Sequence, residues 1–250
     1  MSEESLKSRT AIVTGSGRGI GAAVAIDLAS AGANVVINYL SNEEAARSVR
    51  KKIVDAGGSA LDVQADVSTA EGADALVAAA EKEFGGVDIF VSNAGPLFRP
   101  VPLTEMTWDE FGGTIDQDVR CAFFTTKAVM QGMTERGYGR IVYIGSMSAD
   151  HPTGGLSHHG AARAALTMFA RYVAVETGGS GVTANVVAPG MVRTDRTTSL
   201  GEYLDMVGKS APAGRVATPD DVARAVRHFA GDPDGFVTGA VFPVNGGMSA

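Results

Sequence analysis

The sequence TGSGRGIG at residues 14–21 decides the fold, because it joins a short apolar segment to an alanine-rich amphipathic one. Glycines at alternate positions permit a tight turn and let the backbone approach a pyrophosphate closely. The helix that follows would point the free N–H groups of its first turn at that anion. A glycine pattern alone is weak evidence, but this one lies in the first βα unit of the chain. It predicts a nucleotide-binding turn formed by Gly15, Ser16, Gly17, Arg18, Gly19, Ile20 and Gly21.

Short β-branched or apolar runs alternate with longer amphipathic stretches along the whole chain, which is typical of βα units feeding a parallel sheet. We expect one doubly wound Rossmann domain over residues 1–250, with a seven-stranded, mainly parallel α/β sheet and helices on both faces. The expected strands are 10–14, 33–39, 60–65, 87–92, 140–146, 182–188 and 240–244. The expected helices are 19–30, 42–56, 72–84, 107–135, 158–177 and 219–230. Residues 191–216 have weak periodicity, and we expect them to form a flap over a pocket.

Composition excludes several classes of protein. A formal net charge of −7, with dispersed Lys and Arg, argues against nucleic acid as a partner. The single cysteine, Cys121, rules out an internal disulfide, and no set of residues has metal-ligand spacing. The first nine residues, MSEESLKSR, contain no apolar core of a signal peptide, and no apolar run reaches the roughly 18 residues of a membrane span. We expect a cytoplasmic protein without a membrane partner.

The end of the second expected strand distinguishes the two nicotinamide dinucleotides. An acidic residue there would bind the adenosine ribose of NAD(H) and repel the 2′-phosphate of NADP(H). This chain has Asn38, Tyr39, Leu40 and Ser41 instead. Arg18 and the Ser41 hydroxyl could neutralise and bind an extra phosphate, so NADP(H) is favoured over NAD(H). The alternative is that Arg18 is a solvated surface side chain.

Further motifs follow the glycine turn: Asp66-Val67 after the third strand, Asn93-Ala94-Gly95 after the fourth, Pro189-Gly190 after the sixth, and VTGAVFPVNGG at 237–247. With TGxxxGxG, they resemble the short-chain dehydrogenase/reductase family over essentially the whole chain. The most similar type is the 3-oxoacyl-carrier-protein reductase.

This resemblance implies functions for those motifs. Asp66 and Val67 would flank the adenine, and Asn93, Ala94 and Gly95 would support the cofactor and the sheet. The nicotinamide would meet Pro189, Gly190, Val192 and Thr194. The family is commonly a tetramer built on its fourth and fifth long helices, so a homo-oligomer is implied.

The catalytic positions depart from the family, which uses Asn, Ser, Tyr and Lys. The GSMS segment aligns Ser146 with the catalytic serine. The tyrosine position, thirteen residues later, holds His159, and the lysine position, four further on, holds Arg163. IDQDVRCAFF places Asp118 at the asparagine position. Only the serine is retained.

These replacements change the expected chemistry. An imidazole nitrogen ends roughly 2 Å nearer its backbone than a phenol oxygen, so ordinary carbonyl reduction should be impaired. Histidine titrates near neutral pH and could still transfer a proton, whereas Arg163 could bind ribose hydroxyls but could not relay one. Ser146, His159 and Asp118 are also the residue types of a nucleophile, base and orienting acid. Such a relay requires Ser146 within hydrogen-bond reach of His159, and Asp118 facing the imidazole.

Three functions compete at this point. The first is an atypical NADP(H)-dependent oxidoreductase acting on the carbonyl or alcohol of a small molecule, with Ser146 binding the oxygen and His159 or a water as acid. The second is non-redox chemistry, such as dehydration, cyclisation, isomerisation or displacement, with His159 as acid or base. The third is a non-catalytic NADP(H)-binding subunit that forms a hetero-oligomer with an active homologue.

Overall fold

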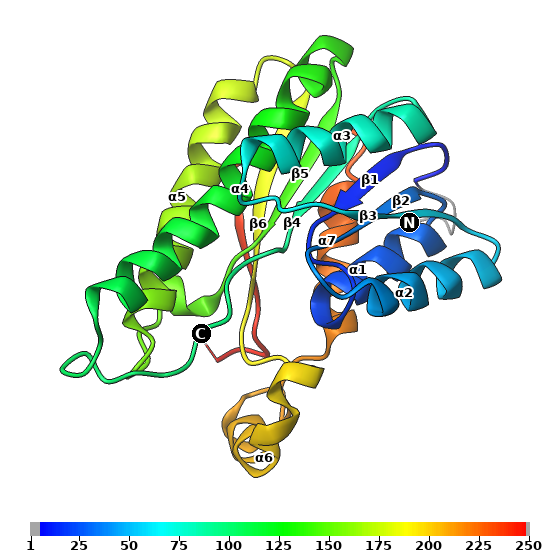
Figure 1. The fold of residues 1–250 in the computed structure, drawn as a ribbon. Helices are drawn as coiled ribbons and strands as arrows, with labels where there is room; N and C mark the ends of the chain where they lie inside the picture. Colours follow the sequence, from blue (N-terminus) through cyan, green and yellow to red (C-terminus); the bar gives the residue numbers. More distant parts are fainter. Residues whose placement is uncertain (1–5, 249–250) are drawn as a thin grey trace.

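The computed structural model describes residues 6–248 and forms a seven-stranded parallel sheet in the order β3-β2-β1-β4-β5-β6-β7 (Figure 1). The four central strands bury every side chain, as expected for parallel strands covered on both faces. They are β1 (Thr10–Val13), β4 (Ile89–Ser92), β5 (Gly139–Ile144) and β6 (Val182–Pro189). The outer strands are β2 (Asn34–Tyr39), β3 (Ser59–Gln64) and β7 (Val241–Val244). The expected doubly wound α/β sheet is confirmed.

Helices cover the sheet in two layers. On one face lie α1 (Gly19–Ser30), α2 (Glu43–Asp55) and α7 (Pro219–Ala230). On the other lie α3 (Ala70–Phe84), α4 (Trp108–Arg136) and α5 (Ser157–Thr177). Alternate residues of a strand serve different layers: Val35 and Ile37 of β2 pack with the first group, while Val36 packs with the second. Within residues 6–248, no helix is long and apolar enough to cross a bilayer.

The element boundaries differ from the sequence prediction by a few residues. Strand β5 ends at Ile144, before the expected limit of 146, so Ser146 lies just beyond the strand and caps the 3-10 helix η1 (Met147–Ala149). Helix α3 begins at Ala70, two residues early, because the Thr69 side chain caps it by accepting a hydrogen bond from the N–H of Gly72.

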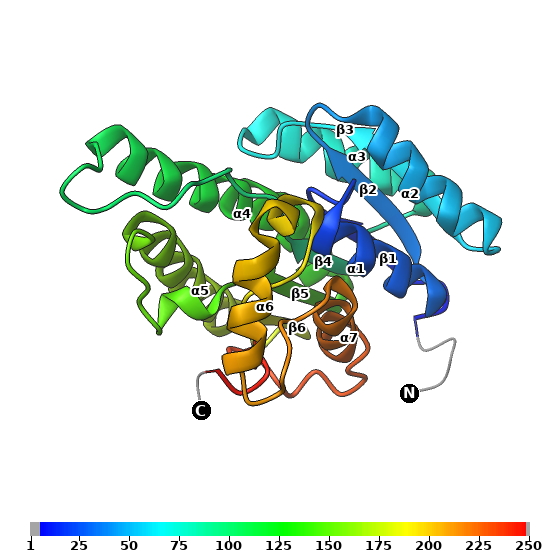
Figure 2. The same cartoon turned by 90° about the horizontal axis from the view of Figure 1, so that it is seen from below.

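The flap, residues 191–216, contains a helix that the sequence prediction lacked. The 3-10 helix η2 (Asp195–Leu200) leads directly into α6 (Gly201–Ser210). Two glycines, Gly201 and Gly208, in a helix of 10 residues explain why its periodicity was weak. Figures 1 and 2 show α6 projecting from the edge of the sheet at which the parallel strands end.

Candidate functional site

The glycine turn is packed so tightly that it excludes side chains. A Cβ on Gly21 would lie 2.6 Å from the side-chain nitrogen of Asn93 and 2.7 Å from the carbonyl oxygen of Gly15. Gly15 itself has a φ of +62°, which side chains rarely adopt. A side chain at either position would displace the turn, so the glycines maintain the tight backbone path that pyrophosphate binding requires.

A polar side chain in β2 and another just after β4 fasten this turn. The Asn93 side-chain N–H donates to the carbonyl oxygens of Thr14 (2.9 Å) and Gly15 (3.1 Å). Asn38 uses both ends of its buried amide: Oδ1 accepts from the N–H of Gly15 (3.2 Å), and Nδ2 donates to the carbonyl of Ala65 (3.0 Å). Asn38 and Asn93 thus position the turn by joining the ends of β1, β2, β3 and β4, whatever contact they also make with a ligand.

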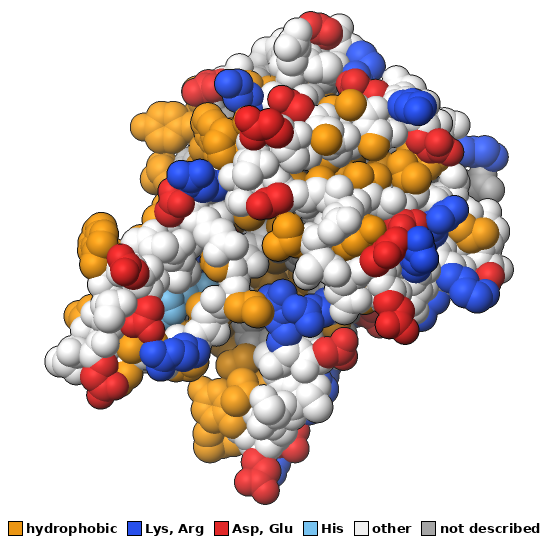
Figure 3. All heavy atoms as spheres, in the orientation of Figure 1, with side chains coloured by type: hydrophobic (Ala, Val, Ile, Leu, Met, Phe, Trp, Pro, Cys, Tyr) orange, Lys and Arg blue, Asp and Glu red, His pale blue; other side chains and the backbone are white. Residues whose placement is uncertain are grey.

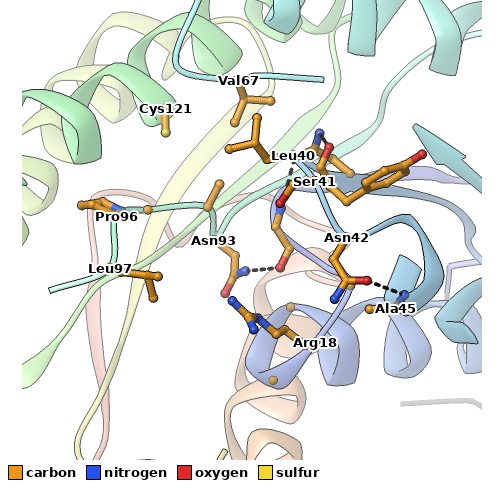
Figure 4. Close-up of a pocket in the computed structure, with 18 of the residues that line it drawn as sticks. Arg18, Leu40, Ser41, Asn42, Ala45, Val67, Asn93, Pro96, Leu97 and Cys121 are labelled. Carbon is orange, nitrogen blue, oxygen red and sulfur yellow. Dashed lines mark hydrogen bonds between the residues drawn. The ribbon is translucent and has the colours of Figure 1, made fainter. Parts of the chain in front are cut away.

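A cavity of about 730 Å³ opens beside the turn, above the ends of β1, β2 and β4 (Figure 4). This volume is in the usual range of small-molecule and cofactor sites. The structure brings most of the predicted cofactor residues together in its wall. They are Gly15, Gly17, Arg18, Gly19, Ile20, Gly21, Asn38, Tyr39, Ser41, Asp66, Val67, Asn93, Ala94, Gly95 and Thr194.

Five of the predicted cofactor residues lie outside this wall, and one of them, Arg163, is described below with Asp118. Ser16 is buried, and its hydroxyl donates to the carbonyl of Val13 at 2.6 Å. Pro189 ends β6, and the N–H of Gly190 donates to the carbonyl of Val244 at 3.1 Å. Val192 is buried and forms a bridge with Ala217. These residues fix the turn and the base of the flap through contacts that a local motif does not reveal.

The β2 end of the cavity lacks a carboxylate, as the sequence indicated. Ser41 is exposed there, and Asn42 caps α2 by accepting from the N–H of Ala45 at 3.0 Å. In Figure 4 the Arg18 side chain extends toward Asn93 and away from Ser41. The predicted phosphate pocket between Arg18 and Ser41 is therefore not preformed, and Arg18 would have to reorient to complete it.

The sequence analysis did not assign several wall residues to the cofactor site. Asn42, Ser68, Asp195 and Arg196 follow predicted residues in sequence, whereas Gln117 and Cys121 come from α4. Arg196 could have been suspected from its place two residues after Thr194. Cys121 is buried, and burial raises the pKa of its thiol to about 12. The thiol stays protonated at neutral pH and contributes only an apolar wall.

The residues expected at the catalytic positions are not part of the wall of this cavity. Two of them, Asp118 and Arg163, lie against Gly95, which does belong to the wall. A Cβ on Gly95 would lie 2.7 Å from Oδ1 of Asp118 and 3.2 Å from Nη2 of Arg163. Ser146 stands after β5, where its Oγ accepts from the N–H of Ser148 at 3.1 Å. Its hydroxyl proton remains available to a substrate oxygen.

His159 is buried beneath Phe98. The two rings are stacked with centroids 4.0 Å apart and planes 20° apart. Burial, reinforced by the charge of Arg163 and by His158, lowers the pKa of His159 to about 3. The expectation that this histidine titrates near neutral pH is therefore wrong, because the imidazole is neutral there.

Asp118 and Arg163 form a buried ion pair. Oδ2 of Asp118 lies 3.3 Å from Nε of Arg163, and the two side chains are 2% and 12% exposed. Nη1 of Arg163 also donates to the carbonyl of Ile144 at 2.7 Å. Burial raises the pKa of Asp118, and the guanidinium opposes that rise. Arg163 is therefore held by the sheet and by α4, which restricts its reach toward a ribose.

The Ser-His-Asp relay is not formed. Asp118 faces Arg163, and Ser146 accepts from Ser148, so neither contacts the imidazole of His159 by a hydrogen bond. The geometry that such a relay requires is absent, because the guanidinium of Arg163 pairs with the carboxylate of Asp118. Among residues 6–248, no three His, Cys, Asp or Glu side chains gather in a way that could hold a metal ion.

The shape and charge of the cavity fit a dinucleotide. The bare glycine backbone leaves space for phosphates, and Arg18 and Arg196 supply positive charge in the wall. Figure 3 shows Lys or Arg side chains at the hollow above α6, with hydrophobic side chains on the neighbouring face of that helix. An anionic cofactor and an apolar substrate would thus find matching surfaces side by side.

Comparison with known proteins places these features in context. Residues 15–249 match the family model described as enoyl-(acyl carrier protein) reductase. The chain is 37% identical to a 3-oxoacyl-[acyl-carrier-protein] reductase of Synechocystis, over 97% of this chain and 98% of the relative. It is 36% identical to a 3beta-hydroxysteroid dehydrogenase of Eggerthella lenta, over 98% and 95%. A short chain dehydrogenase of Burkholderia cenocepacia, solved in complex with NADP, aligns with a TM-score of 0.90 and 34% identity, covering 98% of this chain and 99% of that one.

Proposed function

Because this chain belongs to the short-chain dehydrogenase/reductase family, we propose that it is an NADP(H)-dependent oxidoreductase acting on the carbonyl or alcohol group of a small molecule. The observation that carries this proposal is the 730 Å³ cavity beside the glycine turn, which has positive charge in its wall and no carboxylate at the end of β2. A 2′-phosphate would meet no repulsion there.

The chain's own residues would bind and orient the reactants. Bound NADPH would supply a hydride to the carbonyl carbon. Ser146 would donate its hydroxyl proton in a hydrogen bond to the substrate oxygen, because its Oγ already accepts from Ser148. Asp118 and Arg163 would fix Gly95, which lies between the cavity and the catalytic positions.

The proton for the substrate oxygen would come from water. His159 is neutral at pH 7, so it has an N–H to donate in a hydrogen bond but no readily released proton. The same argument weakens non-redox chemistry with His159 as acid or base, because a group whose pKa is near 3 is a poor base at neutral pH. We therefore give a catalytic imidazole no place in the proposal.

A second candidate is a member of the family that binds NADP(H) without turning over a substrate, and that pairs with an active homologue. The stacking of Phe98 on His159 favours it, as does the enclosure of Arg163 by Asp118 and the carbonyl of Ile144. Residues 118, 159 and 163 are Asp, His and Arg, so none of them offers the phenol or the ammonium group that the family's reaction uses.

The names of the relatives do not narrow the substrate further than a compound with a carbonyl or alcohol group. Their names specify an acyl-carrier thioester in one case and a hydroxysteroid in the other, at 37% and 36% identity. Exposed Leu200, Tyr203 and Met206 at the flap favour an apolar substrate over a charged one.

The test has two stages on the purified chain. NADPH and NADH binding would be measured by calorimetry, with tighter binding of NADPH expected. NADPH oxidation would then be followed with ketones, 3-oxoacyl thioesters and 3-oxosteroids. Ser146→Ala should reduce turnover about a hundredfold, while Ser157→Ala, at the exposed start of α5, should not. NADPH binding without turnover on any of these would favour the second candidate, and absence of binding would overturn both.

We also propose that the chain forms a homo-oligomer through α4 and α5, as the family resemblance implies. Large apolar side chains are exposed on these helices: Trp108, Phe123, Met168, Tyr172 and Val175. Light scattering should show a mass of at least two chains. Phe123→Glu together with Tyr172→Glu should produce a monomer, and a monomeric wild type would refute the proposal.

A further inference from the structure

Two arginines in the wall of the cavity lack protein partners. Neither Arg18 nor Arg196 forms a hydrogen bond or ion pair with its side chain within residues 6–248. Arg193 of the same flap, by contrast, pairs with Asp205 at 2.7 Å. An unpaired guanidinium in a cavity has its donors available for an anionic ligand.

The flap carries Arg196 to the glycine turn. A Cβ on Gly19 would lie 3.7 Å from the methyl group of Thr194, so the start of the flap rests on the N-terminus of α1. Thr194 is fixed in turn, because its N–H donates to Oγ1 of Thr197 at 2.8 Å. Arg196 follows two residues later in η2, close to the point where the first N–H groups of α1 emerge.

The positive charges of Arg18 and Arg196 lie close enough to repel each other. The pKa of Arg196 is lowered by loss of hydration and by the nearby charge of Arg18. The wall also contains two carboxylates, but Asp66 accepts hydrogen bonds from Ser68, and Asp195 forms no ion pair with Arg196. The donors of both guanidinium groups are thus not taken up by either carboxylate.

We propose that Arg196 is a ligand of the cofactor's diphosphate, supplied by the flap opposite the glycine turn and acting with Arg18. This inference rests on the proposed function, since it concerns the same cofactor. The diphosphate is favoured over the 2′-phosphate because Thr194 and Gly19 place η2 at the start of α1. Ser41, the expected 2′-phosphate contact, lies instead at the end of β2.

Cofactor binding then also stabilises the flap. Without an anion, Arg18 and Arg196 repel each other, which opposes closure of η2 on the turn. A diphosphate between them replaces this repulsion with two attractions. Since α6 follows η2 directly, the apolar side chains of Tyr203 and Met206 would be drawn with it toward the substrate side of the hollow.

The test compares Arg196→Gln with Arg193→Gln, a matched control from the same flap whose partner is Asp205. Calorimetry should show Arg196→Gln weakening NADPH and NADH by the same factor, about tenfold, because both contain the diphosphate. Arg193→Gln should leave both affinities within about twofold of the wild type.

Two fragments locate the contact. ADP-ribose contains the diphosphate without the nicotinamide, and its affinity should fall about tenfold in Arg196→Gln. Adenosine 2′-monophosphate contains only the other phosphate, and its affinity should not change. If the substitution weakens adenosine 2′-monophosphate instead, Arg196 binds the 2′-phosphate, and the assignment to the diphosphate is overturned.

Hydrogen exchange supplies a readout that does not depend on activity. Amides of residues 195–210 should exchange more slowly with NADPH in the wild type and in Arg193→Gln, but not in Arg196→Gln. If Arg196→Gln bound NADPH as tightly as the wild type, and NADPH slowed exchange of its residues 195–210 as much as in the wild type, the inference would be overturned. The proposed function would remain intact. A wild type that binds no dinucleotide would instead remove the proposed function.

Discussion

The imidazole of His159 lies face to face with the phenyl ring of Phe98, their centroids 4.0 Å apart and their planes within 20° of parallel. This contact encloses the imidazole and helps to explain why its pKa lies far below neutral pH. The imidazole is buried beneath the ring of Phe98, where water solvates its charged form poorly.

Stability should therefore fall in mild acid. The pKa of His159 is about 3 in the folded chain and about 6.5 when unfolded, so protons bind preferentially to the unfolded state between these values. At pH 5 this effect should remove about 2 kcal/mol of unfolding free energy relative to pH 7.5. Urea titrations at both pH values would measure it. His159→Gln should lose this pH dependence, and the exposed control His151→Gln should keep it; equal slopes in all three proteins would refute the prediction.

Removal of the Asp118 charge should strongly destabilise the fold. Asp118→Asn leaves the guanidinium of Arg163 buried without its counter-charge, and we expect a loss of about 3 kcal/mol. Asp116→Asn, on the same helix, breaks an exposed pair with Arg120 and should cost less than about 1 kcal/mol. Denaturant unfolding of both variants gives the comparison. Similar losses of unfolding free energy would show that the buried pair contributes no more to stability than the exposed one.

A methyl group should be tolerated very differently at two helical glycines. Gly21→Ala places a Cβ within 2.6–2.8 Å of three atoms, so we expect about 2 kcal/mol of destabilisation and weaker NADPH binding. Gly113→Ala adds a methyl group where nothing lies within 4 Å and should raise stability by up to about 1 kcal/mol. Thermal unfolding and NADPH titration would test both, and an unaffected Gly21→Ala would contradict the packed turn.

Cofactor preference should respond to a carboxylate at the end of β2. Ser41→Asp would repel a 2′-phosphate and provide an acceptor for ribose hydroxyls. We expect NADPH affinity to fall at least about tenfold while NADH affinity stays equal or rises. NADH is the internal control, because a general loss of binding would lower both affinities together and leave the preference unexplained.

Restoring the family's residues should create or raise carbonyl reduction. Asp118→Asn, His159→Tyr and Arg163→Lys together place a phenol and an ammonium on α5 and replace the carboxylate of the buried pair by an amide. NADPH-dependent turnover should increase about a hundredfold, the usual contribution of a positioned general acid. The variant without the tyrosine, Asp118→Asn with Arg163→Lys, should gain nothing. A folded, NADPH-binding triple variant with no gain would mean that the substrate pocket has been lost as well.

The sheet and the glycine turn were predictable because their signals are local. Buried strands such as β1 and β6 are mostly apolar and rich in β-branched residues, and the residues from Gly15 to Gly21 are contiguous in sequence. Helix α6 escaped prediction because its two glycines weaken a pattern only 10 residues long.

The relations that decide the chemistry join distant segments. Asp118 belongs to α4 and Arg163 to α5, and nothing in either stretch indicates that the carboxylate faces the guanidinium rather than the imidazole. Phe98 reaches His159 from a loop after β4, and Arg196 enters the cofactor cavity from the flap. Propensity and periodicity specify elements, whereas these contacts depend on how the elements pack.

The buried pair of Asp118 and Arg163 also limits how mutations can accumulate at the two positions. If only one of the two residues is replaced by an uncharged one, the other charge is left without a partner between α4, α5 and the sheet. Few such intermediates would survive selection for stability. We therefore expect the two positions to change together rather than one at a time.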